Sequence, residues 1–156
     1  SDVVGVELAG AAKNVIAIGD GVASGFGLGH ITLAALITRG LHEITRLGLA
    51  YSGDQKTFSG LAGLGDLVLT CTGGLSRNRR TGMELAQGKT LQQILEETTE
   101  VAEGVKNSRV ILQLARAVGV EMPISEQMVA VMYEGKPAKL AVHELMTRDL
   151  KHEAAH

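Results

Sequence analysis

Residues 60–80 read GLAGLGDLVLTCTGGLSRNRR, an apolar run that holds one carboxylate and ends in a cluster of polar and charged side chains. Asp66 lies four residues before Thr70, so a helix over this segment would carry both on one face. A double glycine then lets the backbone approach a bulky or anionic group, and residues 76–78, Ser-Arg-Asn, follow where a new helix could begin. A helix N-terminus beside a guanidinium suits phosphate oxygens. The stretch therefore indicates an anion-binding segment, although a solvated arginine-rich turn explains the spacing equally well.

A second polar pair, Lys13-Asn14, interrupts an apolar repeat near the start of the chain. A lysine beside an apolar face usually lays its stem along that face and keeps its ammonium group in water. His30 and His42 have no cysteine or carboxylate at metal-ligand spacing, so we expect both to be structural or surface residues. The spacing of these residues alone therefore predicts no catalytic role for Lys13 and no metal site.

Composition limits the classes of protein that the chain can belong to. Its 156 residues suffice for one domain with a core, and 45% hydrophobic with 21% charged residues excludes a disordered or fibrous chain. The net charge of −2 creates no field that would attract nucleic acid or a membrane surface, so a local cluster must bind any anion. The single cysteine, Cys71, fits a reducing, cytoplasmic compartment. We find no signal peptide and no apolar run long enough to cross a bilayer.

Apolar side chains recur at helical spacing along the chain, and no alternating run indicates a strand. Thr90 is expected to be an N-cap, Gly88 and Gly119 to end helices, and Pro123 to open one. The sequence thus predicts a single all-α domain of about seven to eight helices, with the clearest segments at 6–23, 30–48, 77–88, 90–97, 105–118, 124–133 and 138–148.

The same repeat predicts which side chains face the core. On segment 30–48 Ile31 is expected to face inward, whereas Glu43 is expected on the wetter side with its charged neighbours. Leu95 and Val110 are expected to face inward on their own helices. The acidic side chains between 96 and 103 are expected to form a solvated face, and the five methionines to fill the core.

Several segments, taken in order, resemble the C-terminal domain of the bacterial NAD(P)-dependent glycerol-3-phosphate dehydrogenase family. The resemblance extends over nearly the whole chain. A single short motif could not produce a match of this extent. The segments that carry it are Val4–Leu8, Ala12–Ile18, Gly63–Leu67 with Thr70-Cys71, Ser76–Arg79, Val101–Gly104 and Met122–Ile124.

The resemblance implies that residues 1–156 form the helical, substrate-binding domain of such an enzyme, with the fold of the C-terminal domain of 6-phosphogluconate dehydrogenase. It implies interconversion of dihydroxyacetone phosphate and sn-glycerol 3-phosphate with NAD or NADP, for glycerophospholipid synthesis. Relatives carry an N-terminal Rossmann domain that this chain lacks. The chain also begins Ser1-Asp2 without an initiator methionine, as though cut from something longer. Because the strand, glycine-rich loop and helix of a nucleotide-binding unit are absent from it, we expect the chain to be inactive alone.

The resemblance also implies roles for individual residues. Lys13 matches the catalytic lysine, and the implied substrate-binding residues are Lys13, Asn14, Asp66, Thr70, Ser76, Arg77 and Asn78. The implied cofactor contacts are Lys13, Arg77, Val101 and Glu103, and no metal is implied.

These residue types suit the implied reaction. When hydride reaches a carbonyl carbon, negative charge grows on the oxygen, and the ammonium group of Lys13 can stabilise that charge and then donate a proton. Burial and the nearby charge of Arg77 would lower the pKa of Lys13 from its ordinary value of roughly 10.4, and Asp66 would limit the drop. A guanidinium with an amide and a hydroxyl would hold the substrate phosphate at a fixed distance from the carbonyl.

Two other functions fit the sequence. The chain could be a helical association module whose Arg77–Arg80 cluster binds a protein or nucleic acid, although sparse aromatic residues and negative net charge disfavour nucleic acid. It could also be a sister dehydrogenase domain acting on another hydroxy acid or sugar phosphate. The sequence leaves NAD or NADP preference open. It also leaves the oligomeric state open, and a homodimer is one state that an apolar helical domain of this kind often adopts.

Overall fold

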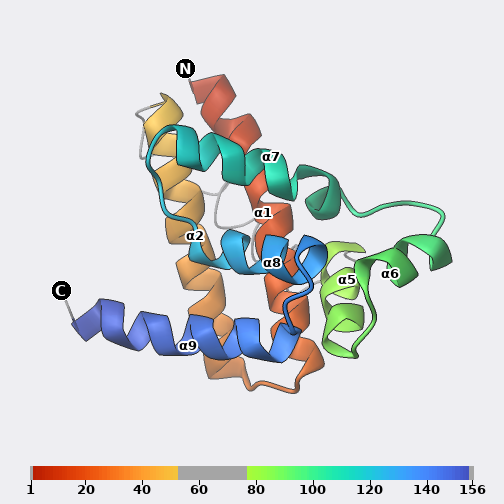
Figure 1. The fold of residues 1–156 in the computed structure, drawn as a ribbon. Coiled ribbons are helices and arrows are strands. Elements are labelled where there is room, and N and C mark those ends of the chain that lie inside the picture. The colour runs from red at the N-terminus through yellow and green to blue at the C-terminus, as the bar shows by residue number, and fades with distance from the viewer. Residues whose placement is uncertain (1, 53–76, 155–156) are drawn as a thin grey trace.

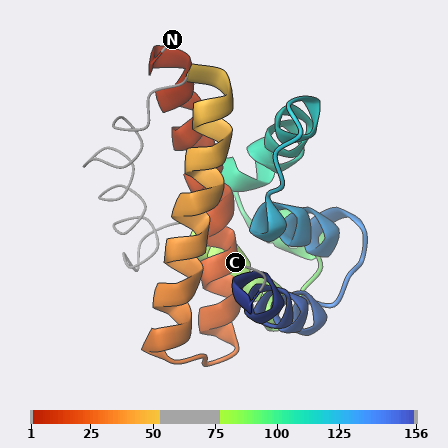
Figure 2. The same cartoon turned by 90° about the vertical axis from the view of Figure 1, so that its left-hand side faces the viewer.

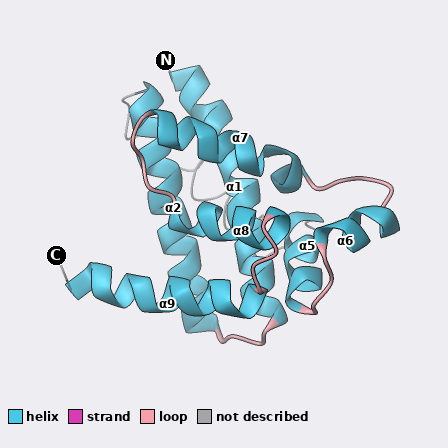
Figure 3. Cartoon of the chain, viewed as in Figure 1, coloured by secondary structure: helices cyan, strands magenta, loops and turns pink. Residues whose placement is uncertain are grey.

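The protein is a bundle of packed helices, seen here in a computed structural model that describes residues 2–52 and 77–154. Within these two ranges every regular element is a helix, which confirms the predicted all-α class (Figures 1 and 3). The helices are α1 (Asp2–Gly25), α2 (His30–Ser52), α5 (Arg77–Ala86), α6 (Leu91–Glu97), α7 (Glu103–Ala117), α8 (Pro123–Tyr133) and α9 (Ala138–Ala154).

α1 is the central helix of the bundle. It pairs lengthwise with α2, and α7, α8 and α9 lie across one side of this pair (Figures 1 and 2). The four consecutive residues 15–18, Val-Ile-Ala-Ile, are all buried, so neighbours cover every side of the helix at this level. The predicted start at Val6 was four residues late, because α1 begins at Asp2.

α1 and α5 approach so closely that side chains are excluded from their contact. A Cβ atom on Gly21 would lie 2.0 Å from the carbonyl oxygen of Arg79, and one on Gly82 would lie 2.0 Å from that of Ile18. Such backbone approach is open only to glycine. This close approach brings α5 against the C-terminal half of α1.

Local sequence signals placed several helix ends correctly. Thr90 caps α6 in a capping box with Gln93, and Pro123 is the first residue of α8. Gly88 and Gly119 have φ values of 97° and 70°, as left-handed residues after a helix require. The predicted bounds differ most at α9, which runs six residues beyond Arg148 to Ala154, and at α2, which runs four residues beyond Gly48.

Several side chains do not face as the repeat predicted. Ile31, Val110 and Leu95 are 89%, 54% and 37% exposed, so their predicted inward orientation was wrong. Conversely, Glu43 was expected on the wetter side of α2 and is only 2% exposed. A helical repeat identifies an apolar face, but tertiary packing decides which residues at its edges are covered.

Glu43 is buried because it caps another helix. Its carboxylate accepts hydrogen bonds from the backbone N–H groups of Ile124 and Ser125 and from the Ser125 hydroxyl, at the N-terminus of α8. Burial raises the pKa of Glu43 to about 7, and these hydrogen bonds and the charge of Arg46 oppose the rise. The guanidinium of Arg46 also donates to the carbonyl of Glu121 at 2.9 Å, so α2 is tied twice to the start of α8.

Within the described ranges no helix is both long and apolar enough to cross a membrane.

Candidate functional site

The predicted site residues divide by whether the structure describes them. Asp66, Thr70 and Ser76, together with the helix considered around Asp66, lie outside the described residues. The others occupy three segments, with Lys13 and Asn14 on α1, Arg77 and Asn78 in the first turn of α5, and Val101 and Glu103 at the start of α7.

Asn78 joins these three segments through hydrogen bonds. Its Nδ2 donates to Oδ1 of Asn14 at 3.0 Å, and its Oδ1 accepts from the backbone N–H of Gly104 at 2.8 Å. Asn14 in turn donates through Nδ2 to the carbonyl oxygen of Gly10 at 3.3 Å. A continuous amide chain therefore runs from Gly104 on α7 through Asn78 on α5 to Asn14 and Gly10 on α1.

Lys13 and Arg77 are the chain neighbours of the two hydrogen-bonded asparagines. Lys13 is half-buried on α1 beside the fully buried Ala12. Because Asn14 and Asn78 are in direct contact, the helical turns that carry Lys13 and Arg77 lie side by side. The two candidate residues thus come from adjacent elements although 64 residues separate them in the sequence.

Gly104 allows the start of α7 to reach this junction. A Cβ atom there would lie 2.7 Å from the Asn14 carbonyl oxygen and 2.8 Å from Asn78 Oδ1. Ala102, the N-cap of α7, makes no side-chain hydrogen bond, so Asn78 satisfies a donor that the N-cap would ordinarily serve. Spacing in the sequence predicts no such role for Gly104, and its signal there is a glycine in the first turn of a helix.

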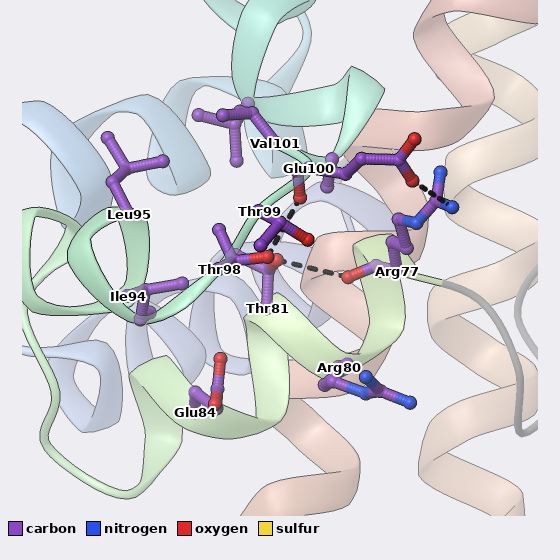
Figure 4. A pocket seen from close by; sticks show the side chains of 12 residues that line it. Arg77, Arg80, Thr81, Glu84, Ile94, Leu95, Thr98, Thr99, Glu100 and Val101 are labelled. Atoms are coloured by element: carbon purple, nitrogen blue, oxygen red, sulfur yellow. Dashed lines mark hydrogen bonds and ion pairs between the residues drawn. The ribbon is translucent and has the colours of Figure 1, made fainter.

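Arg77 lies at the edge of a surface hollow of about 240 Å³ between α5, α6 and the segment leading to α7 (Figure 4). Its guanidinium is exposed and pairs with the carboxylate of Glu100, while the Thr81 hydroxyl donates to its carbonyl at 3.0 Å. Arg80, Glu84 and Val101 also line the hollow. The sequence analysis treated Glu100 as part of a solvated acidic run. It is 63% exposed at its side chain, yet it contacts the main anion-binding candidate.

Arg79 has a structural environment that differs from that of Arg77. Its Nε lies 3.4 Å from the carboxylate of buried Asp20, and it also donates to the Ser24 hydroxyl at 3.1 Å and contacts Met83 Sδ at 3.5 Å. Burial raises the pKa of Asp20, and the charge of Arg79 opposes this rise. Arg79 therefore holds α5 to α1, which leaves Arg77 and Arg80 at the hollow.

The arrangement can bind an anion but offers no evident metal centre. Within the described residues no three histidine, cysteine, aspartate or glutamate side chains gather as metal ligands. An exposed guanidinium at a hollow can bind a phosphate in bidentate geometry. Lys13 is not among the residues that line this hollow, although its helical turn lies beside that of Arg77. Glu103 is exposed, and its chain neighbour Gly104 ties it to Asn78.

Comparison with known proteins gives a consistent result. A family model described as NAD-dependent glycerol-3-phosphate dehydrogenase C-terminus matches residues 2–143. The chain is 61% identical over 153 residues to glycerol-3-phosphate dehydrogenase [NAD(P)+] of Geobacter sulfurreducens, and 58% identical to that of Solidesulfovibrio magneticus. In both cases the match covers 98% of this chain and 46% of the relative, so the chain spans about half the length of these curated relatives.

Solved structures agree with the sequence relatives. The crystal structure of glycerol-3-phosphate dehydrogenase from Coxiella burnetii aligns over 91% of this chain and 44% of its own, with 44% identity and a TM-score of 0.87. DsGPDH of Dunaliella salina aligns over 89% of this chain and 26% of its own, with 26% identity and a TM-score of 0.77. With a helical fold, a family match over most of its length and relatives above half identity, this chain belongs to the NAD-dependent glycerol-3-phosphate dehydrogenase C-terminal family.

Proposed function

We propose that this chain is the substrate-binding half of an oxidoreductase that interconverts dihydroxyacetone phosphate and sn-glycerol 3-phosphate, with NAD or NADP as the cofactor. The observation that carries the proposal is the direct contact of Asn14 with Asn78, since it sets the turn of Lys13 against the turn of Arg77. The product would supply glycerophospholipid synthesis.

Lys13 is the proton donor of the proposed reaction. The nicotinamide cofactor supplies the hydride when it is bound. Lys13 stabilises the charge on the carbonyl oxygen and protonates it, and in the reverse direction it takes the proton from the hydroxyl. Asp66 and Thr70 complete the proposed substrate contacts, together with Ser76 and the asparagine pair.

Arg77 is the proposed phosphate ligand. Its guanidinium is already exposed, so a substrate phosphate can reach it without unfolding of α5. The guanidinium must then exchange the Glu100 carboxylate for phosphate oxygens, and a bidentate contact would fix the distance from phosphate to carbonyl. A guanidinium also suits a cofactor phosphate, which agrees with proposed cofactor contacts at Lys13, Arg77, Val101 and Glu103.

Turnover by an intact dehydrogenase carrying this chain as its C-terminal part tests the role of Lys13. We expect Lys13→Met to lower kcat at least roughly 100-fold while the protein stays folded, because the variant keeps the apolar stem but loses the proton. Lys139→Met on α9 is the matched control and should keep wild-type kcat, since Lys139 is exposed and lies outside the proposed site. A Lys13→Met enzyme with unchanged kcat would contradict the assignment.

Calorimetric titration of this chain with sn-glycerol 3-phosphate tests the phosphate site. We expect Arg77→Ala to abolish the signal and Arg109→Ala to leave it, since Arg109 lies over the Tyr133 ring at 4.0 Å on another part of the surface. An equal loss in both variants would contradict the assignment and favour the alternative of a helical association module. A substrate panel on the intact enzyme separates dihydroxyacetone phosphate from other hydroxy acids and sugar phosphates.

A further inference from the structure

In the amide chain, donors and acceptors can alternate in only one direction, from the Gly104 N–H to the Gly10 carbonyl. A backbone N–H can only donate, so the Gly104 N–H fixes Oδ1 of Asn78 toward α7 and therefore Nδ2 toward α1. A backbone carbonyl can only accept, so the Gly10 carbonyl fixes Nδ2 of Asn14 toward itself and Oδ1 toward Asn78. The two ends agree, and neither amide can be flipped without placing like groups face to face.

We propose that Asn14 and Asn78 are a positioning pair whose ordered amide chain holds Lys13, Arg77 and Glu103 at fixed relative positions. This proposal rests on the proposed function, which gives those three neighbours their roles. It assigns the asparagines a task beyond substrate contact, namely to set the geometry of the groups that bind and react.

Burial supports a positioning role for Asn78. The residue is only 7% exposed, and both the oxygen and the nitrogen of its amide already contact the protein. A buried amide that is held at both its oxygen and its nitrogen has few rotamers open to it, so it transmits the position of one helix to the next. The glycine at 104 strengthens this coupling, because it lets the donor approach Asn78 to 2.8 Å.

Positioning and substrate contact predict different kinetics. If each asparagine only contacts substrate, its loss raises KM and the two losses multiply. If the pair acts as one chain, either substitution breaks the same connection, so kcat falls and a second substitution adds little. Displacement of reacting groups by about 1 Å can lower the rate about 100-fold.

The experiment is a double-mutant cycle in the intact dehydrogenase with Asn14→Ala, Asn78→Ala and the double variant. We expect each single variant to lose roughly 10-fold to 100-fold in kcat/KM, mostly in kcat. The kcat/KM of the double variant should lie within about threefold of that of the less active single variant. Asn107→Ala on α7 is the matched control, because Asn107 is outside the amide chain, and should change kcat/KM less than about twofold. Losses that multiply, or that appear only in KM, would overturn the positioning role.

Folding is checked separately from catalysis. Thermal unfolding screens all variants, and if Asn78→Ala does not fold, Asn78→Asp replaces it, since aspartate keeps the acceptor for Gly104 but loses the donor to Asn14. Without substrate, hydrogen exchange at the Gly104 amide should be at least roughly 10-fold faster in Asn78→Ala than in wild type. Unchanged exchange would show that Asn78 does not hold the Gly104 N–H, and would overturn the proposed amide chain. An intact wild-type enzyme inactive on dihydroxyacetone phosphate would overturn the proposed function, whereas additive losses in an active enzyme would overturn the positioning pair alone.

Discussion

α7 and α8 both begin without a hydrogen bond from an N-cap side chain, but the distant side chains that cap them differ in charge. Their N-cap residues, Ala102 and Met122, make no side-chain hydrogen bond, so a distant side chain supplies the cap. The donor at the start of α7 meets the neutral amide of Asn78, whereas the donors at the start of α8 meet the carboxylate of Glu43. One cap adjoins the proposed site, and the other joins scaffold helices.

The difference follows from what each cap must lie beside. A carboxylate interacts more strongly with a helix N-terminus than an amide does, but beside Arg77 it would compete with a substrate phosphate for the guanidinium. An amide caps α7 without charge. Because amides do not titrate, the geometry around Lys13 should be insensitive to pH, while the stability of the scaffold around Glu43 should change with it.

Gly104→Ala tests whether the neutral cap needs its close approach, and we expect the largest effect there. The added Cβ would lie within 2.8 Å of the Asn14 carbonyl, Asn78 Oδ1 and Ile18, so α7 must move away from α1 and the cap must lengthen. We expect a loss of about 3 kcal/mol in the free energy of unfolding, measured by denaturant titration, and a fall in kcat of more than roughly 100-fold.

Gly10→Ala is the matched control for that substitution. Among the described residues, no heavy atom outside the neighbouring backbone of α1 lies within 4 Å of a Cβ at Gly10, so alanine should raise the free energy of unfolding by about 0.5–1 kcal/mol through helix propensity. Destabilisation by Gly10→Ala, or tolerance of Gly104→Ala, would show that the contact at Gly104 is not what limits the junction.

Glu43→Gln tests the charged cap through its pH dependence. Because the pKa of Glu43 is raised from 4.5 to about 7, the folded protein holds this proton more tightly than the unfolded chain. Its contribution to stability is therefore fully present below pH 4.5 and is lost as pH rises through about 7, by roughly 3 kcal/mol at most. Glutamine does not titrate, so the variant should gain stability relative to wild type as pH rises from 5 to 8.

Denaturant titrations of both proteins at several pH values measure this difference. The groups that oppose the rise in the pKa of Glu43 are Arg46 on α2 and the N-terminus of α8, and both proteins keep them, so the comparison isolates the carboxyl group at position 43. A difference between the two proteins that stays constant with pH would show that Glu43 titrates at its ordinary pKa.

The sequence predicted the fold where the cause is local. Thr90 and Gln93 form their capping box within one turn, and Gly119 and Pro123 mark helix ends through their own backbone properties. It also predicted the fold class, since a helical repeat with few strand signals requires helices packed on helices.

The sequence could not predict the two distant caps, because their partners are far apart in the chain. Glu43 was assigned to the wet side of α2, and only α8, 81 residues later, explains its burial. Asn78 was assigned to the substrate by resemblance, while its bonds to Asn14 and Gly104 depend on how α1, α5 and α7 pack. Hydrogen bonds between distant elements leave no periodic signal in a single sequence.

Asn78→Asp tests the comparison by placing a charge at the neutral cap. Aspartate keeps an acceptor for the Gly104 N–H, so α7 should stay capped and the protein folded. Its second oxygen would face Oδ1 of Asn14 and add negative charge beside Arg77. We expect kcat/KM of the intact enzyme to fall roughly 30-fold at pH 8. The fall should be smaller at pH 5, because burial at position 78 favours the protonated aspartate, which can donate to Asn14.

Steady-state rates at both pH values, divided by wild-type rates, check this prediction. Glu43→Gln supplies the reciprocal control at pH 8, because there it removes the ionised carboxylate from the distant cap, and it should leave the ratio of kcat/KM near one. An Asn78→Asp enzyme with wild-type kcat/KM at pH 8 would show that a neutral cap is not required beside the site.

Glu100→Gln should have the smallest effect, since it concerns an exposed charge. Glu100 holds the Arg77 guanidinium at the edge of the hollow, and a substrate phosphate must displace it. Exposed ion pairs contribute less than about 1 kcal/mol, so removing the carboxylate should tighten binding of sn-glycerol 3-phosphate at most about fivefold, and less in high salt. Glu97→Gln is the control, because Glu97 pairs with Lys89 instead. Weaker binding in Glu100→Gln would show that the carboxylate orients Arg77 for the phosphate and does not compete with it.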